Sequence, residues 1–412
     1  MDEAGTSGKA ALTVLLCFVG ALCEGFDVQA AGVAAGGLSR EFRPTTQELG
    51  IFFSASGAGL IIGAIVGGRG ADRLGRKPVL VASLVTFGFF SLLTSAAPSI
   101  PLLTAARFLT GLGLGGAMPN LIALAADATA SRSRNTSIAT AYVGMPVGGS
   151  LASLVTFLLP LEQWRAVFQV GGVAPLLIVP FLIAYLPAGN SLTPTVTGAP
   201  SATRGMLREL FGQRRAFKTL LLWASFFLIV LTLHLMLNWL PSLLSARGLA
   251  KNSTAIAQAA FNAGGAAVAL WLGALLDSPR QRTSIAVSIL LLPVILLLIA
   301  FSPPRAVVLA VLACLLGGAI LAQQVILYGV ASAYYPAAAR GAGIGAAVAV
   351  GRFGSLIGPL FAASLLAAGR TPSQVLIGVL PIVLACGVCV GLLGWQELAA
   401  PAGRRVHRRN DV

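Results

Sequence analysis

Charged residues are scarce in this sequence. Asp, Glu, Lys and Arg make up 10% of its 412 residues, whereas about a quarter of the residues in a soluble domain are charged. Hydrophobic residues make up 57%, so the chain lacks the polar side chains that a water-facing surface needs. The composition therefore predicts a protein with many membrane-spanning segments and argues against a soluble domain.

Motifs that carry chemistry in enzymes are also missing. There is no G-x4-G-K-[ST] loop to hold nucleotide phosphates, so we do not expect ATP to be the direct energy source. The five cysteines show no metal-ligand or disulfide spacing, and His234 and His407 are the two histidines. We therefore expect no metal, no cofactor and no catalytic triad, and a protein that is not an enzyme.

Acidic residues are the scarcer charge, with 13 Asp and Glu against 28 Lys and Arg and a formal net charge of +15. In a soluble chain this excess would suggest a nucleic-acid partner. In a membrane protein it reflects topology and attraction to anionic lipids, so no nucleic-acid partner is expected. Most Lys and Arg residues lie on the side of the two termini, which predicts that both termini are cytoplasmic in a bacterial-type inner (plasma) membrane.

Long apolar runs fill the rest of the chain, and each is long enough to cross a bilayer as a helix. They predict an all-α, polytopic fold with twelve transmembrane helices. The expected spans are residues 11–37, 49–68, 79–97, 100–125, 136–159, 164–186, 217–240, 254–276, 283–302, 306–332, 340–368 and 373–396.

A polar stretch divides these spans into two sets of six. We expect an N-terminal half over residues 1–186 and a C-terminal half over residues 217–396. The stretch between them, 187–216, is predicted to be a cytoplasmic loop that ends in a short basic amphipathic helix, and residues 397–412 form a basic cytoplasmic tail.

A weak repeat supports the division into halves. Gly68-x3-Asp72 recurs 205 residues later as Gly273-x3-Asp277. Parallel repeats of this kind occur in transporters whose site lies near the bilayer midplane, between the two halves.

Two of the few carboxylates, Glu24 and Asp27, lie near the middle of the first apolar run. They share one face of a helix, one turn apart. A carboxylate at this depth costs on the order of a few kcal/mol and marks a function by default. We predict that Asp27 takes up a proton, which removes the cost of a bare charge. Glu24 either tunes the proton affinity of Asp27 by like-charge repulsion or contacts a substrate.

Two arginines also lie within apolar spans. Arg107 could extend to the membrane interface, or reach inward to Asp27 or to a substrate anion. Arg352 lies between Gly351 and Gly354, which leave room for a guanidinium among packed helices. Its planar fork suits bidentate binding of a carboxylate, and the alternative is an internal ion pair that only holds helices together.

Neutral polar residues in the second half are the remaining candidates for a binding site. His234 is either a proton carrier or a neutral hydrogen-bonding group, and the amides could bind substrate hydroxyls or join helices. Phe26 could stack on an aromatic substrate. The substrate-binding candidates, besides Arg352, are Gln323, Gln324, Tyr328, Asn238, His234 and Phe26.

A charged motif, G-x3-D-R-x-G-R-K, joins the second and third spans in what we expect to be a tight loop. It could be no more than positive charge on the cytoplasmic side. Its alternating charges favour instead a latch between neighbouring helix ends, with Asp127 paired to its arginines. The latch candidates are Gly68, Asp72, Arg73, Gly75, Arg76, Lys77 and Asp127.

The motif resembles the loop signature of the major facilitator superfamily, and Glu24-Gly25-Phe26-Asp27 resembles the D-G-F-D motif of its aromatic acid:proton symporter group. Gly351-Arg352-Phe353-Gly354 is similar to the same group, and the first span resembles 3-(3-hydroxyphenyl)propionate transporters most. The resemblance implies two halves that rock around a central site, proton coupling through Arg107 as well as Asp27 and Glu24, and an Asp72 latch that holds the outward-facing state.

Together these features predict a secondary active transporter that takes up a small aromatic carboxylate with protons by alternating access. It is expected to act as a monomer in the lipid bilayer. The first alternative is a drug or metabolite antiporter that exports its substrate, since Gly144 to Gly149 is similar to an antiporter motif. The second is a membrane sensor derived from a transporter.

Overall fold

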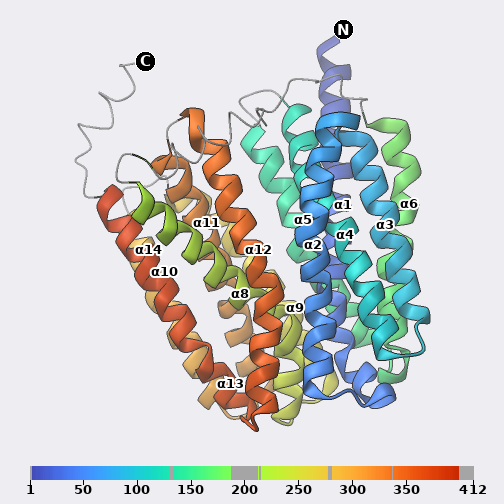
Figure 1. The fold of residues 1–412 in the computed structure, drawn as a ribbon, viewed down its shortest axis with the longest axis vertical. Coiled ribbons are helices and arrows are strands. Elements are labelled where there is room, and N and C mark those ends of the chain that lie inside the picture. Colours follow the sequence, from blue (N-terminus) through green and yellow to red (C-terminus); the bar gives the residue numbers. More distant parts are fainter. Residues whose placement is uncertain are drawn as a thin grey trace.

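The computed structural model describes residues 2–129, 134–186, 212, 215–276, 281–335 and 337–398, which form two bundles of helices side by side (Figure 1). The first bundle contains α1 (Asp2–Phe42), α2 (Thr46–Leu74), α3 (Arg76–Ala96), α4 (Ile100–Asp127), α5 (Arg134–Leu158), the 3-10 turn η1 (Leu161–Gln163) and α6 (Arg165–Tyr185). The second contains α8 (Ala216–Ala246), α9 (Lys251–Leu276), α10 (Gln281–Phe301), α11 (Ala306–Tyr334), α12 (Ala337–Ala367), α13 (Pro372–Gly378) and α14 (Leu380–Leu398).

The all-α transmembrane fold predicted from hydropathy is confirmed. Ten spans in the described part of the chain are long and apolar enough to cross a membrane, with α13 and most of α14 counted as one. Helices α9 and α10, of 26 and 21 residues, are the remaining two of the twelve predicted membrane helices. The helices extend past the apolar runs, because a helix keeps its backbone hydrogen bonds in water beyond the hydrocarbon.

Glycines bring α2 and α4 into backbone contact in the first bundle. A Cβ atom added at Gly59 would overlap the carbonyl of Phe108, and one added at Gly111 would overlap the carbonyl of Ser56. Small residues allow this close approach. It matters in a bilayer because lipid tails are as apolar as the side chains, so helices associate through close van der Waals packing and not through the hydrophobic effect.

The second bundle repeats this contact between α9 and α11. A Cβ atom at Gly264 would overlap the carbonyl of Cys314, and one at Gly317 would overlap that of Phe261. Gly264 lies 205 positions after Gly59, the same offset as the sequence repeat. The repeat therefore includes the helix contacts as well as the loop motif.

The two bundles contact each other near the end where α1 stops and α2 begins. Gly50 of α2 packs on Ala363 of α12, and the ring of Phe53 meets Trp239 of α8 edge-on at 5.1 Å. Lys251, at the start of α9, donates to the carbonyl of Leu159. Helices α2 and α12 lie side by side at this end and diverge toward the other (Figure 1).

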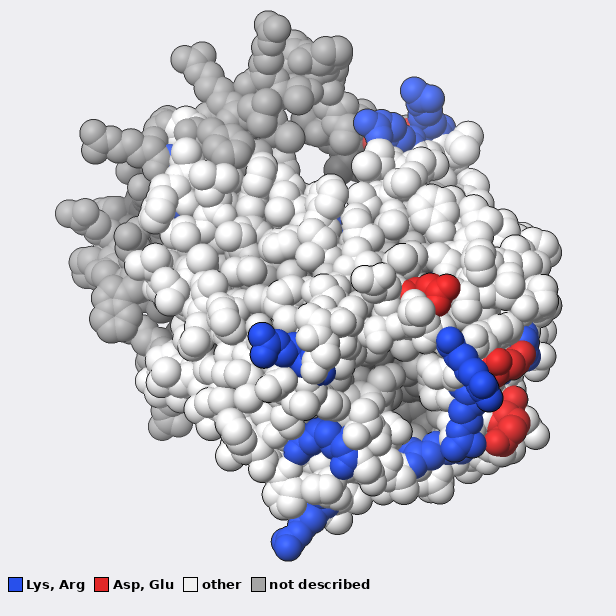
Figure 2. Space-filling model, turned by 60° about the horizontal axis from the view of Figure 1, so that its bottom comes forward, with Lys and Arg blue, Asp and Glu red and all other residues white. Residues whose placement is uncertain are grey.

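Acidic and basic side chains lie together on the face at this end (Figure 2). Arg165 Nη2 lies 2.6 Å from Glu41 Oε1, and Arg40 Nη1 lies 3.6 Å from Glu162 Oε1. Two of the basic side chains on this face are therefore paired with glutamates.

The charged motif differs from its prediction as a loop. Helix α2 continues to Leu74, so Gly68 to Arg73 form its last turns, and Gly75 alone makes the bend, with φ of +90°. Glycine tolerates this conformation because it has no Cβ atom. The predicted helix in the central loop, the basic tail and Asp277 lie outside the described residues.

Candidate functional site

A buried ion pair joins α1 to α4. Arg107 Nη1 lies 2.7 Å from Asp27 Oδ2, and neither side chain is exposed. Ser91 of α3 donates to Asp27 Oδ1 at 2.7 Å, and Arg107 Nη2 donates to the Asp27 carbonyl at 3.2 Å. Because two charges are withdrawn from water only with good partners, these added hydrogen bonds are what such a pair requires.

The surroundings of Arg107 are those of an inward-facing side chain. Its guanidinium lies 5.6 Å from the centre of the Phe168 ring on α6, within range of a cation–π contact. Its Nε has no hydrogen-bond partner. Of the alternatives left open by the sequence, the structure has Arg107 reaching toward Asp27 and away from the interface.

Glu24 lies one turn before Asp27 and has no equivalent ion pair. Its side chain is buried, and Oε2 has no hydrogen-bond partner. It interacts electrostatically with Arg352 of α12 and with Tyr142 of α5. A carboxylate of the first bundle therefore acts across the bundle interface on an arginine of the second.

Arg352 has few protein partners for its five N–H donors. Nη1 lies 3.5 Å from the carbonyl oxygen of Leu60 on α2, at the limit of a hydrogen bond. Tyr142 and Tyr328 interact with it electrostatically, and the Tyr328 ring packs edge-on against Phe226 at 5.1 Å. The guanidinium thus keeps donors for another acceptor.

A pocket of about 80 Å³ lies between α1, α5, α8, α9 and α11. Its polar lining is confined to four side chains, among which Gln324 is buried with no partner for Oε1. The lining residues are Gly25, Val28, Gln29, Tyr142, Met145, Pro146, Leu233, Leu237, Phe261, Asn262, Gly265, Leu321 and Gln324.

Gln29 clasps the two bundles together beside this pocket. Its Nε2 donates to the Leu237 carbonyl of α8 at 2.8 Å, while its Oε1 accepts from Gln258 Nε2 at 3.0 Å and from Asn262 Nδ2 at 3.1 Å, both on α9. The clasp was not predicted from the sequence. Gln258 and Asn262, two amides at i, i+4 in an apolar span, lie on one helix face and could have indicated a polar contact there.

Several predicted binding residues do not reach the pocket. His234 Nδ1 lies 3.1 Å from the Val230 carbonyl, and Asn238 Nδ2 donates to the His234 carbonyl at 2.8 Å, so both bond within α8. Gln323 donates to the Ser288 carbonyl of α10 at 3.3 Å. Phe26 packs on α6, where a side chain at Gly171 would lie 3.2 Å from its ring.

The charged motif makes its described contacts within the first bundle. Arg76 pairs with Asp127 at the end of α4, and Lys77 Nζ donates to the carbonyls of Ile183 and Leu186 at 2.8 and 2.6 Å. Cations are favourable beside the exposed carbonyls at helix C-termini. These bonds tie the start of α3 to the ends of α4 and α6.

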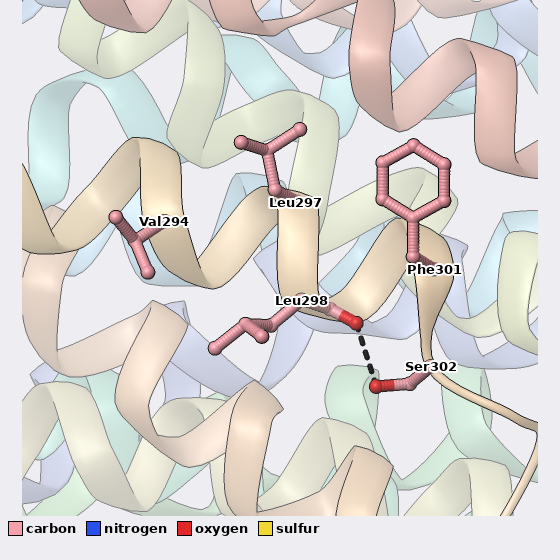
Figure 3. Close-up of a pocket in the computed structure, with 5 residues that line it drawn as sticks. All are labelled: Val294, Leu297, Leu298, Phe301 and Ser302. Atoms are coloured by element: carbon pink, nitrogen blue, oxygen red, sulfur yellow. Dashed lines mark hydrogen bonds between the residues drawn. The ribbon is translucent and has the colours of Figure 1, made fainter.

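A separate apolar groove follows the outer side of α10 (Figure 3). Val294, Leu298 and Phe301 are exposed there, and its single hydroxyl, on Ser302, donates to the Leu298 carbonyl at 2.6 Å. An outward apolar face with its one polar group satisfied suits contact with lipid tails, so the groove is not part of the candidate site.

Known proteins that are similar to this chain belong to the family that the motifs indicate. Residues 17–359 match the family described as Major Facilitator Superfamily. The chain is 40% identical over 389 residues to the 3-(3-hydroxy-phenyl)propionate transporter of Escherichia coli (strain K12), covering 94% of this chain and 95% of that protein. It is 31% identical over 402 residues to the 4-hydroxybenzoate transporter PcaK of Pseudomonas putida, covering 90% of each. The resemblance inferred from the motifs is confirmed.

Solved structures share the fold. The D-xylose-proton symporter has a TM-score of 0.76 at 16% identity, with 92% of this chain and 96% of that chain covered. The inward open conformation of the xylose transporter XylE from E. coli has a TM-score of 0.74 at 17% identity, with 95% and 96% covered.

Proposed function

The chain belongs to the Major Facilitator Superfamily, and we propose that it takes up a small aromatic carboxylate together with protons by alternating access. The protein is a multi-pass membrane transporter with relatives named for aromatic acids, and it is not an enzyme. The proposal concerns proton coupling, the direction of transport and the residues that bind the substrate.

Arg352 is the observation that carries the proposal. It lies where the two bundles meet, its donors are largely unused, and it interacts electrostatically with Tyr142 and Tyr328. A substrate carboxylate can accept two parallel hydrogen bonds from a guanidinium, and the tyrosines can pack on an aromatic ring. A relative named for 3-(3-hydroxy-phenyl)propionate fits a site of this chemistry.

The arrangement of the bundles fits an inward-facing state. The clasp at Gln29 and the contact of Gly50 with Ala363 close the end opposite the termini. If both termini are cytoplasmic, as the distribution of Lys and Arg predicts, the closed end is the outer one. The ion pair of Asp27 with Arg107 then belongs to the state in which the proton has left.

Proton coupling is assigned to the two carboxylates of α1. In the outward-facing state Asp27 takes up a proton, which breaks its ion pair with Arg107 and removes a buried charge before the bundles move. Glu24 interacts electrostatically with Arg352, and we assign it a part in proton coupling next to the anion site. Release inside restores both the ionised Asp27 and its pair.

Transport by purified protein in liposomes tests the proposal. Under an imposed inward pH gradient, Asp27→Asn should lose accumulation of 3-(3-hydroxyphenyl)propionate yet retain exchange of labelled for unlabelled substrate, which needs no net proton movement. Arg352→Ala should lose both activities, since it loses the anion site. Arg305→Ala, an arginine exposed at the start of α11, is the matched control and should behave as wild type.

Three outcomes would contradict parts of the scheme. Full accumulation by Asp27→Asn would remove Asp27 from proton coupling. Normal exchange by Arg352→Ala would place the anion site elsewhere. Movement of substrate outward, against an inward flux of protons, would identify an exporter.

A further inference from the structure

We propose that the pocket between α1, α5, α8, α9 and α11 receives the aromatic ring of the substrate, and that Gln324 binds a phenol hydroxyl on that ring. The inference rests on the proposed function and adds to it a specificity-determining residue. Gln324 would select hydroxylated aromatic acids from their unsubstituted analogues.

The pocket has the lining that an aromatic ring needs. Leu233 and Leu237 of α8, Phe261 of α9 and Leu321 of α11 supply apolar and aromatic surface. Binding pockets for small molecules are mostly apolar, with a few placed polar groups that fix orientation. The polar groups are therefore the ones to examine for specificity.

Most of the polar atoms in and beside the pocket already have partners. Gln29 is held by three hydrogen bonds, and Asn262 donates to Gln29 Oε1 and to the Gln258 carbonyl at 3.1 Å. Gln324 differs: its side chain is 7% exposed, and Oε1 has no partner. It is the buried amide oxygen in the pocket lining that a ligand could satisfy.

An unpaired buried amide is costly, and buried polar atoms in proteins nearly always have a partner. A phenol hydroxyl supplies the missing donor. Because a hydroxyl both donates and accepts, it pairs with either end of the amide group. An unsubstituted ring would bury Gln324 Oε1 without compensation, so the same residue favours one ligand and disfavours the other.

Tyr142 relates the pocket to Arg352. It lines the pocket and also interacts electrostatically with Arg352. In the proposed binding mode the carboxylate lies at Arg352 and the ring enters the pocket that Tyr142 lines. This arrangement suits an acid in which the carboxylate and the hydroxyl are at opposite ends of the molecule.

The neighbouring glutamine provides a matched control. Gln323 is also buried, but it faces away from the pocket, donating to Ser288 and accepting from Cys386 Sγ at 3.4 Å. Successive residues on a helix point about 100° apart. Substitution of either glutamine removes one buried amide. Only substitution of Gln324 should change the selectivity between hydroxylated and unsubstituted acids.

The experiment measures uptake of labelled 3-(3-hydroxyphenyl)propionate in liposomes, with unlabelled 3-(3-hydroxyphenyl)propionate and 3-phenylpropionate as competitors. Wild type should prefer the hydroxylated acid by about tenfold, the value of one good hydrogen bond to a buried group. Gln324→Met, an apolar side chain of similar length, should lower that preference to about one, through weaker binding of the hydroxylated acid. Gln323→Met should keep the wild-type ratio.

Two results would overturn the inference: an unchanged ratio in Gln324→Met, or a wild type that binds both acids equally. The second needs no variant, so the inference stays testable if Gln324→Met does not fold. A wild type that transports neither acid would refute the proposed function itself.

Discussion

The buried pair of Asp27 and Arg107 leads to a prediction about stability that is separate from transport. Arg107→Met removes the charge and keeps an unbranched apolar side chain. Asp27 is then left fully buried with Ser91 as its remaining side-chain partner. Breaking a buried ion pair from one side costs about 3–5 kcal/mol, so we expect the free energy of unfolding to fall by that amount.

Removal of both charges should cost less than the sum of the single changes. In Asp27→Asn/Arg107→Met neither an unpaired carboxylate nor an unpaired guanidinium is buried. Paired removal of a buried ion pair is often close to neutral. The double-mutant cycle should therefore give a favourable coupling energy of at least about 3 kcal/mol, the upper end of the range for residues in contact.

Equilibrium unfolding in mixed detergent micelles, followed by tryptophan fluorescence, measures these energies. Trp164 is a suitable reporter because its ring packs edge-on against Phe168 at 6.0 Å, next to Arg107. Arg40→Met is the control. Its pair with Glu162 is exposed, at 69% and 74%, so its loss should cost less than about 1 kcal/mol.

The reasoning would be refuted if Arg107→Met were no less stable than Arg40→Met. It would also be refuted if the double variant lost as much stability as the two single variants together, because the charges would then act independently.

Two further changes test helix packing and the clasp. Gly63→Ala should lower the unfolding temperature, because a Cβ atom there would overlap the Leu112 carbonyl. Gly68→Ala is the control and should leave the unfolding temperature unchanged, because a Cβ atom at Gly68 has no neighbour within 4 Å. Equal effects of the two changes would argue against close packing of α2 and α4. Gln29→Leu removes the clasp between the bundles, so backbone hydrogen exchange in the first turns of α9 should become faster, as measured by mass spectrometry. Unchanged exchange there would argue that other contacts keep the two bundles together at that end.

The membrane helices and the charged residues within them could be predicted from the sequence alone. Hydropathy was sufficient to predict twelve membrane helices, since a helix in lipid must satisfy its own backbone. It also singled out Asp27 and Arg107, because buried charges are costly and rarely tolerated without a role. Their direct contact, 80 positions apart in the chain, depends on helix packing that the sequence does not record.

Neutral polar residues were harder to assign. Gln323 and Gln324 are adjacent and chemically identical, so only the rotation of α11 separates a packing amide from one that lines the pocket. Gln29 was unremarkable in sequence, because its role depends on three partners in the other bundle. The loop between the second and third spans was predicted too long because α2 extends beyond its apolar run to Leu74.

Asp27 and Gln29 are two residues apart on one helix, and this spacing has a consequence for energy coupling. Two residues correspond to about 200° of rotation and about 3 Å of rise, so the two side chains leave opposite faces of α1. Asp27 is bonded within its own bundle, and Gln29 is bonded to the other. A rotation or tilt of α1 that loosens one set of bonds acts at once on the other. Within the proposed cycle, protonation of Asp27 therefore acts through one helix on the clasp at Gln29, which disfavours leakage of protons without substrate.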